Sequence, residues 1–317
     1  CIIHFQIFSI KMRLFFFEVV FVLILCIYNI FVDGRGWEGW TKIQSSVKNW
    51  ASSDYTEFGY SLIVYPQSSS DRVLILNNLN IASPTTPDWV QFQLYRDGVC
   101  VTQSDEAVTA ARFFDSGESM GVGFSYFDSP GKTGGSSGIE YVIKAFGKTV
   151  MSSGGISRSL SGMVFPSTYV ISSNKKFAAL TIDSTTDVSL DVDVTVTLTA
   201  TDSVFIVVTC DANGDNVGGV ETKAIFSLYR QNALITPLQV ASIANSGRNR
   251  AINFVFHDAP GAGTHTYSAR AKRSGSSSAY TLSEYDRDLR TATAIVFPGA
   301  ESSRAMNSAE KTITGTS

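Results

Sequence analysis

An internal repeat constrains the fold of this chain more than any other feature of its sequence. Four short blocks occur in the first half and return in the same order in the second half. The pairs of blocks are residues 92–96 with 226–230, residues 124–131 with 254–261, Tyr141 with Tyr267, and residues 163–166 with 295–298. Because the spacing between partners changes by only a few residues, we infer a duplicated module whose loops have changed length.

Each repeated block has the residue pattern of a β-strand. Val90, Phe92 and Leu94 alternate with polar glutamines, so that one face of the strand is apolar. The Asp-Ser-Pro-Gly run at 128–131 then supplies residue types that favour a tight turn. Such strands recur along the chain and helical periodicity is not evident after the N-terminal segment. The pattern predicts an all-β fold of two tandem jelly-roll-like β-sandwiches after an N-terminal apolar signal segment.

The N-terminal residues have the pattern of a secretory signal. Met12 lies between two basic residues, and residues 14–32 are almost wholly apolar. Residues 1–11 are therefore predicted to be upstream translated sequence. Residues 12–34 are predicted to be a signal peptide that is cleaved, or a signal-anchor that stays in the membrane. Both alternatives place the protein outside the cell, secreted or at the cell surface, with membrane contact through this segment alone.

The repeat also predicts how the rest of the chain is divided. We expect the first module at residues 36–166 and the second at 174–298, followed by a flexible tail at 299–317 that is rich in Ser, Thr and Ala. The join between the modules is short. The two modules are therefore expected to pack against each other rather than move freely.

Charge and cysteine content exclude two classes of protein. The chain has 25 basic and 28 acidic residues and a net charge of −3, whereas nucleic-acid binding needs clustered Lys and Arg. No nucleic-acid partner is therefore expected. After the signal only Cys100 and Cys210 remain, which are too few for a disulfide framework. Whether these two cysteines pair is left open by the sequence.

Some stretches resemble known jelly-roll proteins. Leu-Tyr-Arg-Asp-Gly at 94–98 and Ser-Leu-Ser-Gly-Met-Val-Phe-Pro at 159–166 are similar to strands of the globular heads of complement and tumour-necrosis-factor type proteins. The run from Asp258 to Tyr267, with its Asp-Ala-Pro-Gly turn, resembles jelly-roll modules of virus and phage surface proteins. The resemblance implies a jelly roll that can assemble as a trimer. It rests on structural residues and implies no binding site.

Motifs of hydrolytic enzymes are matched only by their letters. Gly-Glu-Ser-Met-Gly at 117–121 fits the G-x-S-x-G pattern, but a strand rather than a helix is predicted to follow it. His257 and His265 have no third ligand nearby and no histidine counterpart in the first module. Nothing places two carboxylates on opposite sides of a cleft, as glycoside hydrolysis requires. The sequence therefore predicts no catalytic residues and a protein that is not an enzyme.

Two groups of residues are candidates for binding. Asp211, Asn213 and Asp215 have the alternating oxygen ligands of a calcium loop, although the EF-hand positions that should follow are not filled. The alternative is an Asx-rich turn, and no other cofactor is expected. Trp37, Trp40 and Trp50 gather at the start of the first module and are candidates for a ligand platform. Their alternative role is packing in the core of a sandwich.

The predicted function is binding or assembly outside the cell, by recognition of a glycan or a protein surface. One alternative is a structural subunit of a virion or surface appendage that self-assembles around a symmetry axis. A second alternative is a glycan-active hydrolase. Assembly predicts equivalent apolar patches on both modules, whereas ligand binding predicts a cluster of residues that only one module has.

Overall fold

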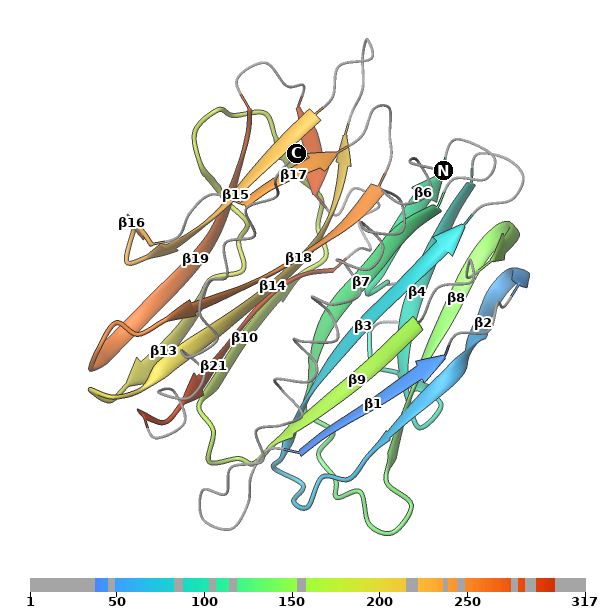
Figure 1. The fold of residues 1–317 in the computed structure, drawn as a ribbon, viewed down its shortest axis with the longest axis horizontal. Coiled ribbons are helices and arrows are strands. Elements are labelled where there is room, and N and C mark those ends of the chain that lie inside the picture. The colour runs from blue at the N-terminus through green and yellow to red at the C-terminus, as the bar shows by residue number, and fades with distance from the viewer. Residues whose placement is uncertain are drawn as a thin grey trace, which may run out of the picture.

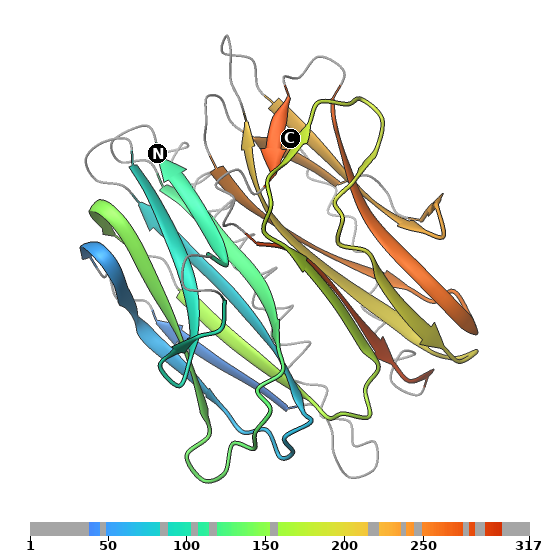
Figure 2. The same ribbon diagram turned by 180° about the vertical axis from the view of Figure 1, so that it is seen from behind.

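A computed structural model describes residues 38–44, 49–82, 88–102, 107–113, 119–152, 158–214, 222–235, 239–243, 249–274, 279–282 and 289–299. Most of these residues lie in strands, which form two bodies side by side (Figures 1 and 2). We call them the first sandwich (β1 to β9) and the second sandwich (β10 to β21). No helix among the described residues is long and apolar enough to cross a membrane.

The first sandwich has the strand order of a jelly roll. Its strands are β1 (Glu38–Gln44), β2 (Asn49–Val64), β3 (Arg72–Ala82), β4 (Asp88–Arg96), β5 (Val99–Cys100), β6 (Thr109–Phe113), β7 (Ser119–Asp128), β8 (Ile139–Ser152) and β9 (Arg158–Phe165). One layer pairs in the order β1-β9-β3-β7 and the other in the order β2-β8-β4-β6, with β5 also on β4. The layers are joined by the single pair Ala82↔Ser152. Two facing four-stranded layers in this order, with β5 as an additional short strand, make a jelly roll.

The second sandwich repeats this order. Its strands are β10 (Ile171–Lys176), β11 (Leu180–Ile182), β12 (Val188–Ser189), β13 (Val194–Leu198), β14 (Ser203–Gly214), β15 (Thr222–Arg230), β16 (Ala233–Leu234), β17 (Gln239–Ile243), β18 (Asn249–Asp258), β19 (Gly263–Arg273), β20 (Tyr280–Leu282) and β21 (Arg290–Phe297). One layer pairs as β10-β21-β14-β18, with β20 also paired with β14 and β11 paired with β20. In the other layer β12 and β13 pair with β19, which pairs with β15, and β15 pairs with β17 and β16.

The repeated sequence blocks occupy equivalent strands, which confirms the predicted all-β fold of tandem sandwiches. The 92–96 and 226–230 blocks end β4 and β15, and each strand pairs with the strand that carries Tyr141 or Tyr267. Arg96 lies opposite Tyr141 and Arg230 lies opposite Tyr267, so the register is the same in both copies. The predicted boundaries at 36–166 and 174–298 remain a prediction, with described strands spanning 38–165 and 171–297.

The recurrence of the Arg, Asp and Tyr positions has a physical reason. Arg96 Nη1 lies 2.8 Å from Asp128 Oδ2, and the Tyr141 hydroxyl donates to the same oxygen at 2.6 Å. Arg96 and Tyr141 come from one layer and Asp128 from the other, so the triad ties the two layers together. The equivalent residues of the second sandwich, with the same contacts, are Arg230, Asp258 and Tyr267.

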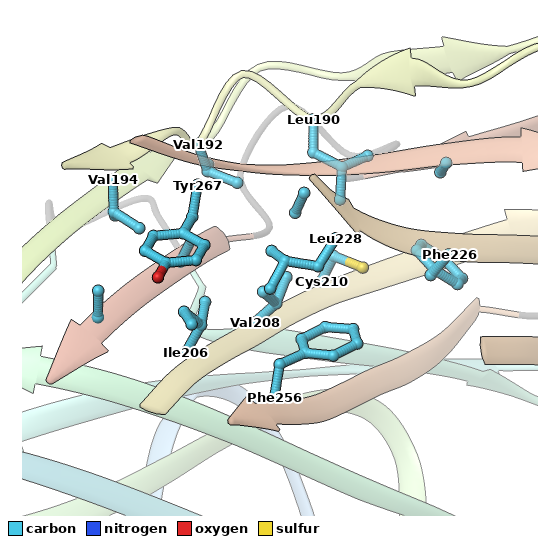
Figure 3. Packing of buried hydrophobic residues seen from close by; sticks show 14 of the residues in the cluster. Leu190, Val192, Val194, Ile206, Val208, Cys210, Phe226, Leu228, Phe256 and Tyr267 are labelled. Atoms are coloured by element: carbon cyan, nitrogen blue, oxygen red, sulfur yellow. The ribbon is translucent and has the colours of Figure 1, made fainter. Parts of the chain in front are cut away.

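The two cores differ in what completes them. The core of the second sandwich is formed by buried apolar residues between Ile182 and Val296, whose side chains point toward one another from both layers (Figure 3). The core of the first sandwich includes Leu289, which is fully buried and comes from the segment before β21. Phe177 and Ala251 of the second sandwich also pack against it. Residues of the second sandwich therefore complete the core of the first.

The inner layers of the two sandwiches face each other along a seam (Figure 1). Near the connection between the sandwiches the seam is apolar, with Leu74, Met163, Phe165, Tyr169 and Ile295 packed together. Phe165 and Phe297, which hold equivalent positions in the two copies, meet edge to face with 6.5 Å between ring centroids. These contacts agree with the expectation that the modules pack against each other.

Further along β14 the seam is polar. Thr109 of β6 donates to Asp211 Oδ1 at 2.9 Å, and the backbone N–H of Ser125 donates to Thr209 Oγ1 at 3.2 Å. Thr209 in turn donates to Asn253 Oδ1 at 2.7 Å. All of these side chains except that of Asn253 are buried, so their hydrogen bonds fix the two sandwiches in one register.

Candidate ligand-binding face

The outer layer of the second sandwich carries the most distinctive polar cluster of the described residues. In β19 the inward side chains His265, Tyr267, Ala269 and Ala271 are buried, and the alternate side chains point outward. In β15 Phe226 and Leu228 point inward, so Ser227 and Tyr229 point outward beside Arg270 and Lys272. This layer lies on the side of the second sandwich away from the first (Figures 1 and 2). We define the outer-face cluster as Asp187, Ser227, Tyr229, Arg270 and Lys272.

Asp187 is the centre of the outer-face cluster. Its Oδ2 accepts a hydrogen bond from the Tyr229 hydroxyl at 2.5 Å, and its Oδ1 accepts one from Ser227 Oγ at 3.1 Å. Lys272 Nζ lies 3.5 Å from Asp187 Oδ2. The preceding residues are held by Arg273, which donates from its Nε to the carbonyl of Asp183 at 2.8 Å. The segment that carries Asp187 is therefore fixed over β19 and β15.

These contacts shift the pKa values of Asp187 and Tyr229. Burial alone would raise the pKa of Asp187, but the hydrogen bonds from Tyr229 and Ser227 and the charge of Lys272 outweigh it. The pKa of Asp187 is therefore below its ordinary value, and this carboxylate stays ionised in mildly acidic solution. The hydrogen bond to Asp187, followed by burial, raises the pKa of Tyr229, which keeps its hydroxyl proton.

The guanidinium of Arg270 has no carboxylate partner among the described residues. Its guanidinium carbon lies 4.2 Å from the centre of the Tyr229 ring, and its Nη2 donates to Asn232 Oδ1 at 2.5 Å. The turn between β15 and β16 places Asn232, because Gln231 and Asn232 both have positive φ (48° and 66°). The Nε of Arg270 is buried and has no hydrogen-bond partner. The guanidinium therefore stacks on a ring and retains unused donors.

The first sandwich serves as an internal control for this face. The register matches Gln93 with Ser227 and Lys144 with Arg270, since Gln93 lies opposite Lys144 as Ser227 lies opposite Arg270. Tyr95 also carries a cation over its ring, with Lys144 Nζ at 4.1 Å from the centroid. Its hydroxyl, however, donates to Gln93 Oε1 at 2.9 Å instead of to a carboxylate. The tyrosine and cation are shared by both copies, whereas the Asp187 centre belongs to the second sandwich.

The residues predicted as a calcium loop lie elsewhere. Asp211 and Asn213 are in strand β14 and not in a turn, and both are buried at the polar seam with 1% exposure. Asp211 accepts the hydrogen bond from Thr109, and the side-chain amide of Asn213 has no hydrogen-bond partner. Asp215 lies outside the described residues, so the calcium site remains a prediction. Among the described residues no group of three or more His, Cys, Asp or Glu side chains could hold a metal.

The predicted tryptophan platform is described only in its backbone. Trp40 lies in β1 opposite Gly162, and Trp50 lies in β2 opposite Met151. Trp37 lies outside the described residues, as do the side-chain positions of the other two. The platform therefore stays a prediction.

The other sequence motifs have structural positions. Ser119 of the G-x-S-x-G match begins strand β7, as expected for a turn that leads into a strand. His265 points into the second sandwich, where its Nε2 lies 3.1 Å from the carbonyl oxygen of Gly261. Cys100 and Cys210 are both free thiols, and burial raises the pKa of Cys210 above its ordinary value.

Sequence reasoning missed the outer-face cluster, although part of its signal was present. The alternation in β19 places Arg270 and Lys272 on one face, and the repeat aligns that face with Lys144 and Phe146 of the first module. Comparing outward positions between the copies would have marked this strand. Asp187 gave no such signal, because it precedes a two-residue strand and reaches the cluster only through the fold.

Comparisons with known proteins give no family. No protein-family model matches the chain, and no curated protein matches it. Among solved structures, N-glycanase F (PNGase F) aligns with 9% identity over 78% of this chain and 95% of its own, with a TM-score of 0.38. The tandem CBM22 domain of Paenibacillus barcinonensis Xyn10C aligns with 12% identity over 81% and 92%, with a TM-score of 0.21. A structure of infectious bursal disease virus aligns with 9% identity over 86% and 76%, with a TM-score of 0.26.

One of these similarities corrects a prediction. N-glycanase F is an enzyme, so the comparison contradicts the prediction that this chain is not one. That prediction rested on the lack of recognisable catalytic motifs, and short motifs identify only those active sites that follow a known spacing. A virus structure is among the similar ones, as the jelly-roll resemblance implied. The resemblance to complement and tumour-necrosis-factor type heads stays a prediction.

Proposed function

We propose that this chain binds a glycan outside the cell through the outer-face cluster of the second sandwich. The observation that carries the proposal is the divergence of one copy. Two copies with the same strand order need the same core and layer contacts, so residues that differ on one outward face are not required by the fold. Ser227 and Lys272 differ in this way from Gln93 and Phe146, and Ser227 and Lys272 are the residues that hold Asp187 on this face together with Tyr229.

The chemistry of the face suits a polyhydroxylated ligand. Tyr229 and Arg270 offer a stacked ring and guanidinium, and Asp187 and Lys272 offer an acceptor and a donor beside them. Ser227 is fully buried and holds Asp187 in place. Polar groups that converge on an aromatic side chain can fix the orientation of a ligand. Tyr229, Arg270 and Lys272 lie on paired strands, and hydrogen bonds hold Asp187 beside them, so little ordering is needed on binding.

The scattered distribution of exposed apolar side chains favours ligand binding over assembly. The large exposed hydrophobic residues of the described chain lie on five different segments: Ile63, Val99, Val170, Leu234 and Val255. Isolated apolar residues of this kind are normal on a protein surface. Val99 and Leu234 lie on the equivalent hairpins β4–β5 and β15–β16, but among the described residues each is a single exposed side chain and not part of an apolar patch of the kind that the assembly alternative requires.

A glycan microarray tests the proposal directly. The full chain should bind a subset of glycans, and Tyr229→Ala should lose that binding by at least about tenfold in Kd. Tyr95→Ala, the equivalent change in the first sandwich, serves as the matched control and should leave binding unchanged. The proposal is wrong if no glycan is bound, or if both variants weaken binding equally.

A further inference from the structure

We infer that the glycan bound at the outer-face cluster is an acidic polysaccharide that carries carboxylate or sulfate groups. This inference rests on the proposed function and names the ligand class of the same face.

The central strands of this layer carry only positive charge. Strands β15 and β19 contain no acidic residue, and their outward positions carry Lys223, Arg270 and Lys272. Arg230 and Arg273 have the opposite orientation and pair with Asp258 and Asp183. In the first sandwich the equivalent strands β4 and β8 contain residues of both signs, with Asp88 in β4 and Glu140 in β8 as well as Arg96 and Lys144. This positive face occurs in a chain whose net charge is −3. A local excess of one sign attracts ligands of the other.

Two of the acidic residues near these strands, Asp187 and Asp183, are paired with basic residues of β19. Asp187 binds Tyr229, Ser227 and Lys272, and Asp183 lies 3.6 Å from Arg273 Nε. Asp191 and Asp193 lie between β12 and β13, at the edge of the layer, where Asp191 acts electrostatically on Arg290 of the other layer. None of these carboxylates forms an ion pair with Arg270.

Arg270 is therefore the cation best placed for an anionic ligand. Its described partners are the Tyr229 ring and a neutral amide oxygen, so its charge is not neutralised by the protein. A guanidinium can bind a carboxylate or a sulfate through two parallel N–H donors. Tyr229 limits the movement of the guanidinium, which lowers the entropy lost when it binds a ligand. Lys272 and Lys223 extend the positive charge on the same face.

Three polysaccharides with one backbone test the inference: dextran, carboxymethyl-dextran and dextran sulfate. The full chain should bind one or both charged forms at least about tenfold more tightly than dextran, by calorimetry at low salt. The carboxymethyl and sulfate forms distinguish the two possible anionic groups. Binding should weaken as salt is raised from about 50 mM to 300 mM, because salt screens exposed charges.

The variants Arg270→Gln and Lys272→Gln identify the face that binds. Each should lower the affinity for the charged form by about tenfold, while Lys144→Gln, the counterpart of Arg270→Gln, leaves it unchanged. Unchanged unfolding temperatures would show that the variants fold. Equal binding of dextran and its charged forms, or charged binding that Arg270→Gln and Lys272→Gln leave intact, overturns the inference. If either result overturns this inference, loss of neutral-glycan binding on the microarray with Tyr229→Ala would still support the proposed function.

Discussion

The two sandwiches share a strand order, a register and an Arg-Asp-Tyr triad, yet they differ in two respects. The first borrows Leu289, Phe177 and Ala251 from the second to complete its core, whereas the core of the second consists of its own residues. The second has the Asp187 centre on its outer face, where the first has a neutral pair, Gln93 and Tyr95. The shared features are those that close a jelly roll. The differences show that one copy depends on the other for stability, and that the independent copy has acquired a distinct surface.

The largest effect is expected when the two sandwiches are expressed apart. Residues 171–299 should unfold cooperatively in urea, whereas residues 36–166 should lack a cooperative transition because part of their core is missing. Both pieces expose the same seam, so exposure of the seam does not account for a difference between them. A first sandwich that folds alone with a sharp transition would contradict the dependence inferred from its core.

Substitution of the borrowed residue tests the same dependence in the full chain. Leu289→Ala should lower the free energy of unfolding by about 3 kcal/mol, because it leaves a cavity in a fully buried site. Leu234→Ala, at a residue that is 51% exposed, should change it by less than about 0.5 kcal/mol. Urea titration measures both. Similar values for the two variants would show that Leu289 is not part of the first core.

The triads offer a comparison of matched residues. Asp128→Asn and Asp258→Asn should each lower the free energy of unfolding by about 2 kcal/mol, since each leaves an arginine without its charged partner. The effect should be larger at Asp128, which has 10% of its side chain exposed, against 18% for Asp258. If one substitution has no effect, the triad is not a shared requirement of the two copies.

The smallest effect concerns the pH dependence of Asp187. Because its pKa is lowered in the folded state, Asp187 stabilises the protein above the ordinary carboxyl pKa of about 4, and this contribution is lost as pH falls through the folded pKa. Asp187→Asn should therefore reduce stability at neutral pH by less than about 1 kcal/mol, and the difference from wild type should vanish in acid. Thermal unfolding at several pH values measures it, and a difference that persists at pH 2 would assign the effect to lost packing.

The alternation of apolar residues, the Asp-x-Pro-Gly turns and the internal repeat were enough to predict the strands and the tandem jelly roll. These features act over a few residues or compare one segment with another, so they can be read along the chain. The same local patterns did not show how far the strand at 203–214 extends into the Asx-rich run. An Asx-rich run suggests a loop, but β14 continues to Gly214 because β18, β20 and the first sandwich cover and pair with it.

Contacts between distant segments were decided by the tertiary structure alone. The alternation in β15 and β19 shows that Tyr229 and Arg270 point to one face, but not that Asp187, about forty residues before Tyr229, is carried over them. Nor does the pattern around Leu289 show which of two equivalent cores it enters. Periodicity determines which side of a strand is apolar, whereas the choice of partner depends on the packing of the whole chain, where many weak contacts are summed.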